Sequence, residues 1–151
     1  IPTCVDPKKR NFPFYKNVSL FKPNLKELRE GLKTDIETPE EEKLYQAALT
    51  LHQKQGIEKV FITLSEYGVF IADFTSQEPK AEIQPAYLRK IADVSGAGDT
   101  VISVASLCMA LGLDAFETAK ISNMSGGLVC ESVGVVPINK EKLLSELLRS
   151  K

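Results

Sequence analysis

The stretch from Asp93 to Asp99, DVSGAGD, places two carboxylates around a turn of very small residues. We expect a strand to end just before it and an apolar helix to begin at about Ala97. Unpaired backbone N–H groups and the helix dipole make a helix start an anion-binding position, and small residues let a phosphate oxygen approach the backbone. The stretch therefore predicts an anion hole formed by the backbone amides of Gly96, Ala97 and Gly98.

Asp99 would lie in the first turn of this helix, facing the same opening. A carboxylate there binds phosphate poorly, but it can take the proton of an attacking hydroxyl while the amides hold the charge that develops on a transferred phosphoryl group. The spacing alone leaves a second interpretation open, in which Ser95 or Asp93 caps the helix and the glycines only form the turn. The P-loop pattern GxxxxGK[ST] and the dinucleotide pattern GxGxxG are both absent.

Apolar runs that alternate with helical patterns predict the elements that position this turn. They indicate an α/β fold with a mostly parallel sheet, helices on both faces and a hairpin at one side. Ligands of such sheets bind outside the carboxyl ends of the strands. We expect strands at about 3–5, 18–22, 59–64, 69–74 and 82–91, and helices at about 24–32, 39–55, 97–111, 114–130 and 139–149.

The composition is that of an ordinary soluble domain, with 151 residues, 43% hydrophobic residues, 26% charged residues and a net charge of -1. The 19 Lys and Arg residues are scattered, which argues against nucleic acid as a partner. The three cysteines, Cys4, Cys108 and Cys130, have neither disulfide-framework nor zinc-site spacing, which favours a reducing cytoplasm. No apolar run is long enough to cross a membrane. The opening residues IPTCVD resemble a buried strand without its earlier neighbours, so we expect a fragment or a processed piece.

Several other polar residues admit a purely structural interpretation beside a functional one. Asn24 could simply cap the helix that follows it, and Glu27 could simply favour the first turn of that helix. The lone His52 is expected at the surface of a charged helix. Asp6 and Lys8 follow a strand, where they could contact a phosphate or the substrate, although a solvated loop explains them equally well.

The same stretches resemble the ribokinase-like (PfkB) carbohydrate kinases. DVSGAGDT looks like the carboxyl-terminal signature D-T-x-G-A-G-D, with Val94 in place of the common Thr. KPNLKEL is similar to the N-x-x-E element of the family, at Asn24 and Glu27. VFITLSEYG resembles the turn T-L-G-x-x-G, and the run from 121 to 138 resembles the helix beside the adenine, where Asn123 matches a recurrent Asn.

Within this family, the likeness is greatest to the kinase domains of the bifunctional heptose enzymes of lipopolysaccharide biosynthesis. It rests on VDPK, on PNLKE and on DVSGAGDTVIS taken with the run that follows Asn123. The likeness covers essentially the whole chain, but only the nucleotide-binding half of such a kinase. Residues 1–151 would then be the carboxyl-terminal half of a ribokinase-like three-layer sandwich, without the amino-terminal sugar-binding and lid half.

The resemblance implies transfer of the γ-phosphoryl group of ATP, with Mg²⁺, to a sugar or sugar-phosphate hydroxyl. The implied substrate is a heptose 7-phosphate, phosphorylated at the anomeric position with Asp99 as the base. Glu27 would help to place Mg²⁺ indirectly. The residues implied to bind ATP are Asn24, Leu25, Lys26, Glu27, Thr63, Ser65, Gly68 and Asn123.

Two departures from the family pattern would change nucleotide affinity. Ser65 adds a side chain where the family has Gly, and Tyr67 lies where related enzymes often carry Lys. A kinase for a fructose- or ribose-like sugar and a noncatalytic nucleotide-binding module remain the alternatives. The implied partners are the sugar substrate, the missing half of the kinase, without which this half would be inactive, and a second copy in a homodimer.

Overall fold

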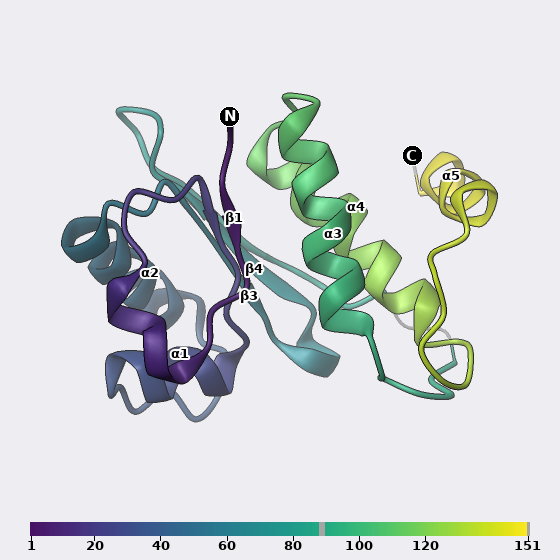
Figure 1. Ribbon diagram of the computed structural model, residues 1–151, viewed down its shortest axis with the longest axis horizontal. Coiled ribbons are helices and arrows are strands. Elements are labelled where there is room, and N and C mark those ends of the chain that lie inside the picture. The colour runs from purple at the N-terminus through teal and green to yellow at the C-terminus, as the bar shows by residue number, and fades with distance from the viewer. Residues whose placement is uncertain (88–89, 151) are drawn as a thin grey trace. The chain divides into compact units, whose positions relative to one another are not determined.

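The computed structural model describes residues 1–87 and 90–150 and divides the chain into two compact units, residues 1–85 and 86–151. In Figure 1, unit 1 runs from purple to teal and unit 2 from green to yellow. Unit 1 holds the β-sheet with α1 and α2, whereas unit 2 is built from helices.

The sheet of unit 1 has five strands in the order β1-β2-β3-β4-β5. The two pairs β1–β2 and β2–β3 are parallel, and the two pairs β3–β4 and β4–β5 are antiparallel. The sheet is therefore mixed, with the expected hairpin formed by β3 and β4. The strands are β1 (Cys4–Val5), β2 (Leu20–Phe21), β3 (Lys59–Thr63), β4 (Val69–Asp73) and β5 (Lys80–Gln84).

One face of this sheet is covered by α1 (Leu25–Leu32) and α2 (Glu41–Gln55), which lie beside the strands in Figure 1. Strand side chains alternate between faces, so every second residue of β3 and β4 points toward these helices. These side chains form one apolar core with the inward residues of α1 and α2, and it includes Phe21, Val60, Ile62, Phe70, Leu28, Leu44 and Leu51. This core fixes the carboxyl ends of β1 to β3, where ligands of α/β sheets bind.

The segment between β1 and β2, expected as a loop, contains the 3-10 helix η1 (Lys9–Phe14). Phe12 of η1 is buried against α1, and a Cβ atom on Gly31 would overlap its ring. The buried side chain of Gln55 donates to the carbonyls of Phe12 and Tyr15, at 2.9 and 2.7 Å. Two long-range hydrogen bonds and a close ring contact thus order a segment for which the sequence patterns predict only a loop.

Most of the expected helix ends are confirmed. Asn24 and Asn139 cap α1 and α5 (Lys140–Arg149), and Asp114 caps α4 (Ala115–Val129). Gly56 ends α2 in the left-handed conformation. The remaining helix, α3 (Ala97–Ala110), begins at the glycine-rich turn. In unit 2, α3 and α4 pack closely, because a Cβ atom on Gly126 would lie 2.7 Å from Val101 Cγ2.

Three expectations were wrong. The strand expected at 82–91 is instead β5, which begins at Lys80 and ends at Gln84, and residues 88–89 lie outside the described part. The described residues that lead into the turn and begin it, 90–95, form no strand. His52 is half-buried rather than exposed, because its ring stacks on Phe74 and its Nδ1 lies 2.8 Å from the Ile57 carbonyl.

Two further observations concern the cysteines and the lengths of the apolar helices. Cys108 and Cys130 are buried, Cys4 is half-buried, and all three are free thiols. Burial raises the pKa values of the Cys108 and Cys130 thiols. Within the described residues, no helix combines the length and the apolar character that a membrane span needs.

Candidate functional site

Unit 1 brings the N-x-x-E element and the turn after β3 together. Asn24 and Thr63 form an isolated parallel bridge, and the Thr63 amide donates to the Pro23 carbonyl at 3.1 Å. Asn24 and Glu27 form a reciprocal capping box, in which Asn24 Oδ1 accepts from the Glu27 amide at 2.8 Å and Glu27 Oε2 accepts from the Asn24 amide at 2.9 Å. The structural interpretation of this pair is therefore confirmed, and it leaves the functional one open.

An open cavity of about 460 Å³ lies beside this bridge. Five of the residues expected to bind ATP line it: Asn24, Leu25, Lys26, Thr63 and Ser65. Tyr67, which we expected to affect nucleotide affinity, lines it as well, and so does Arg29, which sequence reasoning did not assign to a site. Lys26, Arg29 and the exposed ring of Tyr67 suit a ligand with both phosphate and planar groups, and two carboxylates, those of Glu37 and Glu66, line the cavity too.

The turn after β3, η2 (Ser65–Tyr67), has an unusual backbone. Ser65 has a φ of 54°, a left-handed conformation that costs a non-glycine residue free energy, and Leu64 precedes it with φ -119° and ψ 22°. The Leu64 amide bonds the Gly68 carbonyl, but the amides of Ser65 and Glu66 bond no acceptor among the described residues. Consecutive amides in such a turn form a concave anion site. This geometry supports the assignment of Ser65, and Gly68 contributes by closing the turn.

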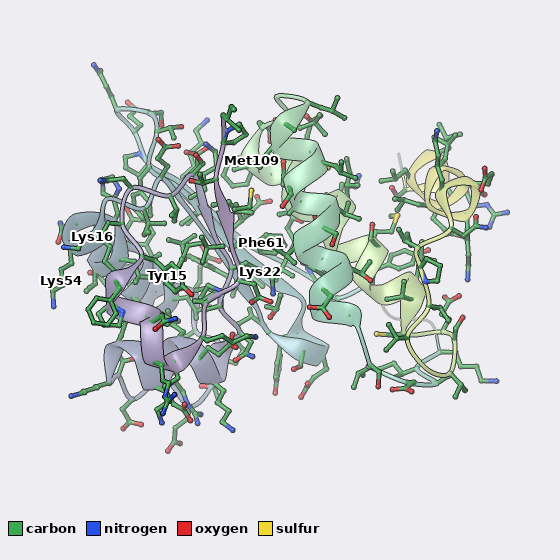
Figure 2. All side chains as sticks on the ribbon, viewed as in Figure 1. Tyr15, Lys16, Lys22, Lys54, Phe61 and Met109 are labelled. Carbon is green, nitrogen blue, oxygen red and sulfur yellow. The ribbon has the colours of Figure 1, made fainter. Side chains whose placement is uncertain are left out.

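Asp6 and Lys8, expected as possible phosphate contacts, have separate partners. Lys8 is largely exposed and its Nζ lies 4.0 Å from Glu27 Oε1, whereas Asp6 Oδ1 lies 3.3 Å from Nζ of Lys22. Lys22 is only 3% exposed and lies against the strands in Figure 2, in contrast to Lys16 and Lys54 at the surface of unit 1.

Lys22 was missed by sequence reasoning, although a signal was present. It directly follows β2, and Asp6 directly follows the neighbouring parallel strand β1. The carboxyl ends of parallel strands meet at one edge of a sheet. The sequence alone would therefore have allowed us to predict an ion pair between Asp6 and Lys22.

In unit 2, the glycine-rich turn forms the N-terminus of α3, with Gly96 at the N-cap position and a φ of 78°. The Ala97 amide already donates to the Val94 carbonyl at 3.3 Å, because the turn closes on itself. Of the three amides expected to bind an anion, that of Ala97 therefore already has an acceptor, and the anion hole stays a prediction. The amides of Gly96, Gly98 and Asp99 itself bond no acceptor among the described residues, as is usual for a helix start.

Asp99 lies in the first turn of α3, as expected, and is exposed. Its carboxylate has no hydrogen bond and no ion pair among the described residues, and only its backbone carbonyl accepts a bond, from Ser103 Oγ. A carboxylate without a structural partner, beside open amides at a helix start, remains available to a ligand.

Asp93 and Ser95 do not cap α3, which has no side-chain cap. Instead, Asp93 Oδ1 accepts from the amide and the hydroxyl of Ser95, at 2.9 and 2.7 Å, and Asp93 Oδ2 accepts from the Gly134 amide at 3.0 Å. The bonds from the Ser95 hydroxyl, the Ser95 amide and the Gly134 amide hold the pKa of Asp93 below its usual value. The capping role that the second interpretation gave to Ser95 or Asp93 is therefore wrong, and sequence reasoning missed Gly134.

Asn123, the last expected ATP-binding residue, is half-buried on α4 in unit 2. The expected site residues thus form two groups, one in each unit. Unit 1 holds those from Asp6 to Gly68, and unit 2 holds the turn, Asp99 and Asn123.

Known proteins match both the sequence and the fold. Two proteins named bifunctional protein HldE are similar, one from Syntrophotalea carbinolica (36% identical over 143 residues) and one from Koribacter versatilis (35% over 147 residues). The alignments cover 95% and 97% of this chain but only 28% and 29% of those proteins. The chain therefore spans less than a third of the length of these relatives.

Two solved structures share the fold at 20% identity. They are an Arabidopsis thaliana ribokinase complexed with ribose and ATP (TM-score 0.80) and the Escherichia coli phosphofructokinase-2 in complex with substrates and products (TM-score 0.81). Each match covers 99% of this chain and 48% of the solved chain. The fold is accordingly ribokinase-like, and it represents part of such a domain. The model of the pfkB family of carbohydrate kinases matches residues 13–142, and the chain belongs to this family.

Proposed function

We propose that the chain forms the ATP-binding half of a kinase that transfers the γ-phosphoryl group of ATP to a hydroxyl of a sugar or sugar phosphate. The observation that carries this proposal is the unpartnered carboxylate of Asp99 at the start of α3, beside the open amides of Gly96 and Gly98. A base and a fixed anion site are what phosphoryl transfer to an alcohol requires. Membership of the pfkB family supports the same reaction.

Each group of residues has a role in this proposal. Asp99 accepts the proton of the attacking hydroxyl, and the amides of the turn hold the charge on the transferred phosphoryl group. In unit 1, the Ser65 turn and the cavity beside Asn24 bind the phosphates and the nucleoside of ATP. Asn123 contacts the base, as the family resemblance implies.

Mg²⁺ fits the residues of unit 1 as an indirectly held ion. The described residues contain no cluster of three or more His, Cys, Asp or Glu side chains that could hold a metal. Mg²⁺ does not need one, because it keeps several waters and binds through one or two carboxylates together with substrate phosphates. Glu27 would act through water, since its Oε2 already bonds the Asn24 amide. Bound there, Mg²⁺ would neutralise phosphate charge.

For the substrate, we propose a heptose 7-phosphate, phosphorylated at its anomeric hydroxyl. This follows from the resemblance of VDPK, PNLKE and DVSGAGDTVIS to the heptose kinases, and the similarity to the two HldE proteins supports it. The sugar pocket would lie in a further part of the protein, since the chain covers only 48% of each solved kinase. The chain without that part should not phosphorylate sugars.

A substrate panel tests this proposal with the full-length protein. We expect ATP-dependent turnover of heptose 7-phosphate, and a ³¹P signal of the product that couples to the anomeric proton. Turnover of fructose 6-phosphate or ribose alone would point to the alternative specificity. Binding of ATP without turnover of any sugar would favour the noncatalytic nucleotide-binding module.

Asp99→Asn tests the base within the same protein. The amide cannot accept the hydroxyl proton, so we expect kcat to fall by roughly a thousandfold while the Kd for ATP changes little. Glu117→Gln is the matched control, because Glu117 is the exposed acid in the first turn of α4. Near-normal turnover of Asp99→Asn would remove Asp99 from this role.

A further inference from the structure

Lys22 and Asp6 form an ion pair at the carboxyl ends of two neighbouring parallel strands. Asp6 directly follows β1 and Lys22 directly follows β2, and the preceding residues, Val5 and Phe21, are partners in the sheet. The Lys22 amide donates to the Val5 carbonyl at 2.8 Å, which fixes the backbone just before Asp6. Lys22 Nζ lies 3.3 Å from Asp6 Oδ1. The pair therefore belongs to the edge of the sheet where ligands of α/β folds bind.

This pair lies on the sheet face that α1 and α2 do not cover. Phe21 belongs to the apolar core beneath these helices, and Val5 packs against that core. Successive side chains of a strand point to opposite faces, so Asp6 and Lys22, each one residue later, point away from α1 and α2. Neither residue lines the cavity beside Asn24. The pair is thus a separate feature of the carboxyl edge.

The two partners differ in exposure. The side chain of Lys22 is 3% exposed, whereas that of Asp6 is 25% exposed. A buried charge is costly unless a counter-ion pairs with it, and Asp6 is the counter-ion of Lys22 among the described residues. The cation therefore supports the carboxylate from behind, and a ligand that reaches this edge meets the carboxylate first.

The second oxygen of Asp6 is available to such a ligand. Asp6 Oδ2 has no hydrogen bond and no ion pair among the described residues. The neighbouring acid is already engaged, because Glu27 Oε2 accepts from the Asn24 amide and Glu27 Oε1 lies 4.0 Å from Lys8 Nζ. An ionised carboxylate only accepts hydrogen bonds. The complementary ligand group is therefore an O–H donor.

We propose that Lys22 is a positioning residue for phosphoryl transfer: by holding Asp6 Oδ1, it keeps Asp6 Oδ2 in place to accept a hydrogen bond from a ligand O–H group. The donor is a hydroxyl of the sugar substrate or a water bound to Mg²⁺, which offer the same chemistry. This inference rests on the proposed function. Lys22 itself touches no ligand and acts through Asp6, and a misplacement of about 1 Å can cost roughly a hundredfold in rate.

A kinetic double-mutant cycle in the full-length protein tests this dependence. Lys22→Met replaces the ammonium group by an unbranched apolar side chain, and Asp6→Ala removes the acceptor. We expect kcat/KM to fall roughly tenfold in Lys22→Met and roughly a hundredfold in Asp6→Ala. In the Asp6→Ala background, Lys22→Met should change kcat/KM by no more than about twofold, because no acceptor is left to position.

A purely structural role of the pair predicts a different pattern. The variants would then lower Tm, whereas kcat/KM per folded molecule would stay at the wild-type value. Lys16→Met is the matched control, because Lys16 is exposed on unit 1, as Figure 2 shows, and has no ion pair among the described residues. We expect this variant to keep kcat/KM within about twofold of wild type.

Mn²⁺ binding distinguishes the two donors without measuring turnover. The EPR signal of free Mn²⁺ is followed during titration of the full-length protein in the presence of a nonhydrolysable ATP analogue. Weaker Mn²⁺ binding in Asp6→Ala than in wild type would identify the donor as a metal-bound water. Unchanged Mn²⁺ binding together with the loss of kcat/KM would identify it as a sugar hydroxyl.

The results also distinguish the inference from the function on which it rests. An active wild type whose Asp6→Ala variant keeps kcat/KM within about twofold would overturn the inference alone, and so would losses from Lys22→Met and Asp6→Ala that multiply in the double variant. The double variant leaves no buried charge unpaired, so its kcat/KM decides the matter if a single variant does not fold, and a value near wild type would overturn the inference. A wild type that phosphorylates no sugar would overturn the proposed function, and this inference with it.

Discussion

The two carboxylates of the turn differ in their surroundings. Asp93 accepts three hydrogen bonds, whereas the carboxylate of Asp99 accepts none among the described residues. Donors that bond a carboxylate stabilise its charged form and make it a weaker base. The three bonds therefore suit Asp93 to a structural role, whereas the carboxylate of Asp99 stays available to a ligand.

The bonds to Asp93 make a contribution to stability that depends on pH. Its pKa in the folded protein lies below the usual value of 3.8, so the stabilisation is complete above that value and is lost as the pH falls through the lower folded pKa. We expect the stability difference between wild type and Asp93→Asn to be constant from pH 7 to about pH 5 and to shrink below about pH 4.

Urea unfolding of both proteins between pH 7 and pH 3 measures this difference. The other carboxylates are common to both proteins, so their titration cancels. A difference that stayed unchanged down to pH 3 would mean that the bonds to Asp93 do not favour its ionised form.

Partners close in sequence were more predictable than distant ones. The bonds of Asn24 with Glu27 and of Asp93 with Ser95 join residues two or three positions apart, and local spacing indicates them. The Gly134 amide lies 41 residues from Asp93, and no local pattern can identify it. His52 was misplaced for the same reason, since Phe74, which directly follows β4, covers its ring.

At the scale of elements, the contact between η1 and α1 depends on a glycine in a helix. Gly31→Ala removes the entropic disadvantage of Gly, worth about 1 kcal/mol, but the new Cβ overlaps the buried Phe12 ring, and overpacking costs about 1–3 kcal/mol. We expect a net destabilisation of about 1 kcal/mol in denaturant unfolding.

The Phe12→Leu background provides the control for this prediction. A smaller side chain at position 12 relieves the overlap, so Gly31→Ala should there become neutral or slightly stabilising. The same destabilisation in both backgrounds would show that the overlap with Phe12 is not its cause.

Helices were predicted better than strands and loops. Their caps and stops, such as Asn24, Gly56 and Asn139, act within one turn and are visible in sequence. We expected one long extended segment at 82–91, but pairing with β4 ends at Gln84. Alternation indicates which residues can face a core, whereas the partner strand decides where pairing stops.

At the scale of the whole molecule, stability should concentrate in the middle of the sheet. β3 and β4 each pair on both sides, and their residues Val60, Phe61, Phe70 and Ile71 have no exposed surface. In hydrogen exchange followed by mass spectrometry, we expect peptides from 59–63 and 69–73 to exchange slowest in unit 1. Equally slow exchange in 80–84 would contradict this, because β5 pairs only with β4 among the described residues.

The fold class was predictable at two levels. Alternating patterns indicated an α/β protein, and only the resemblance of particular motifs specified the ribokinase-like sandwich, which the solved structures confirm. The mixed character of the sheet follows from the β3–β4 hairpin and from the second hairpin made by β5, whose short connection from β4 carries a weak turn signal.

The capping box of Asn24 and Glu27 has a consequence for the evolution of this family. The pair stabilises α1 whether or not a nucleotide is bound, so selection for a folded protein alone would preserve it. A lineage that lost kinase activity could therefore keep its N-x-x-E element indefinitely. Asp99 has only a weaker second reason to persist, the interaction of its charge with the start of α3. Its loss would therefore be the earlier mark of a descendant that no longer catalyses the reaction.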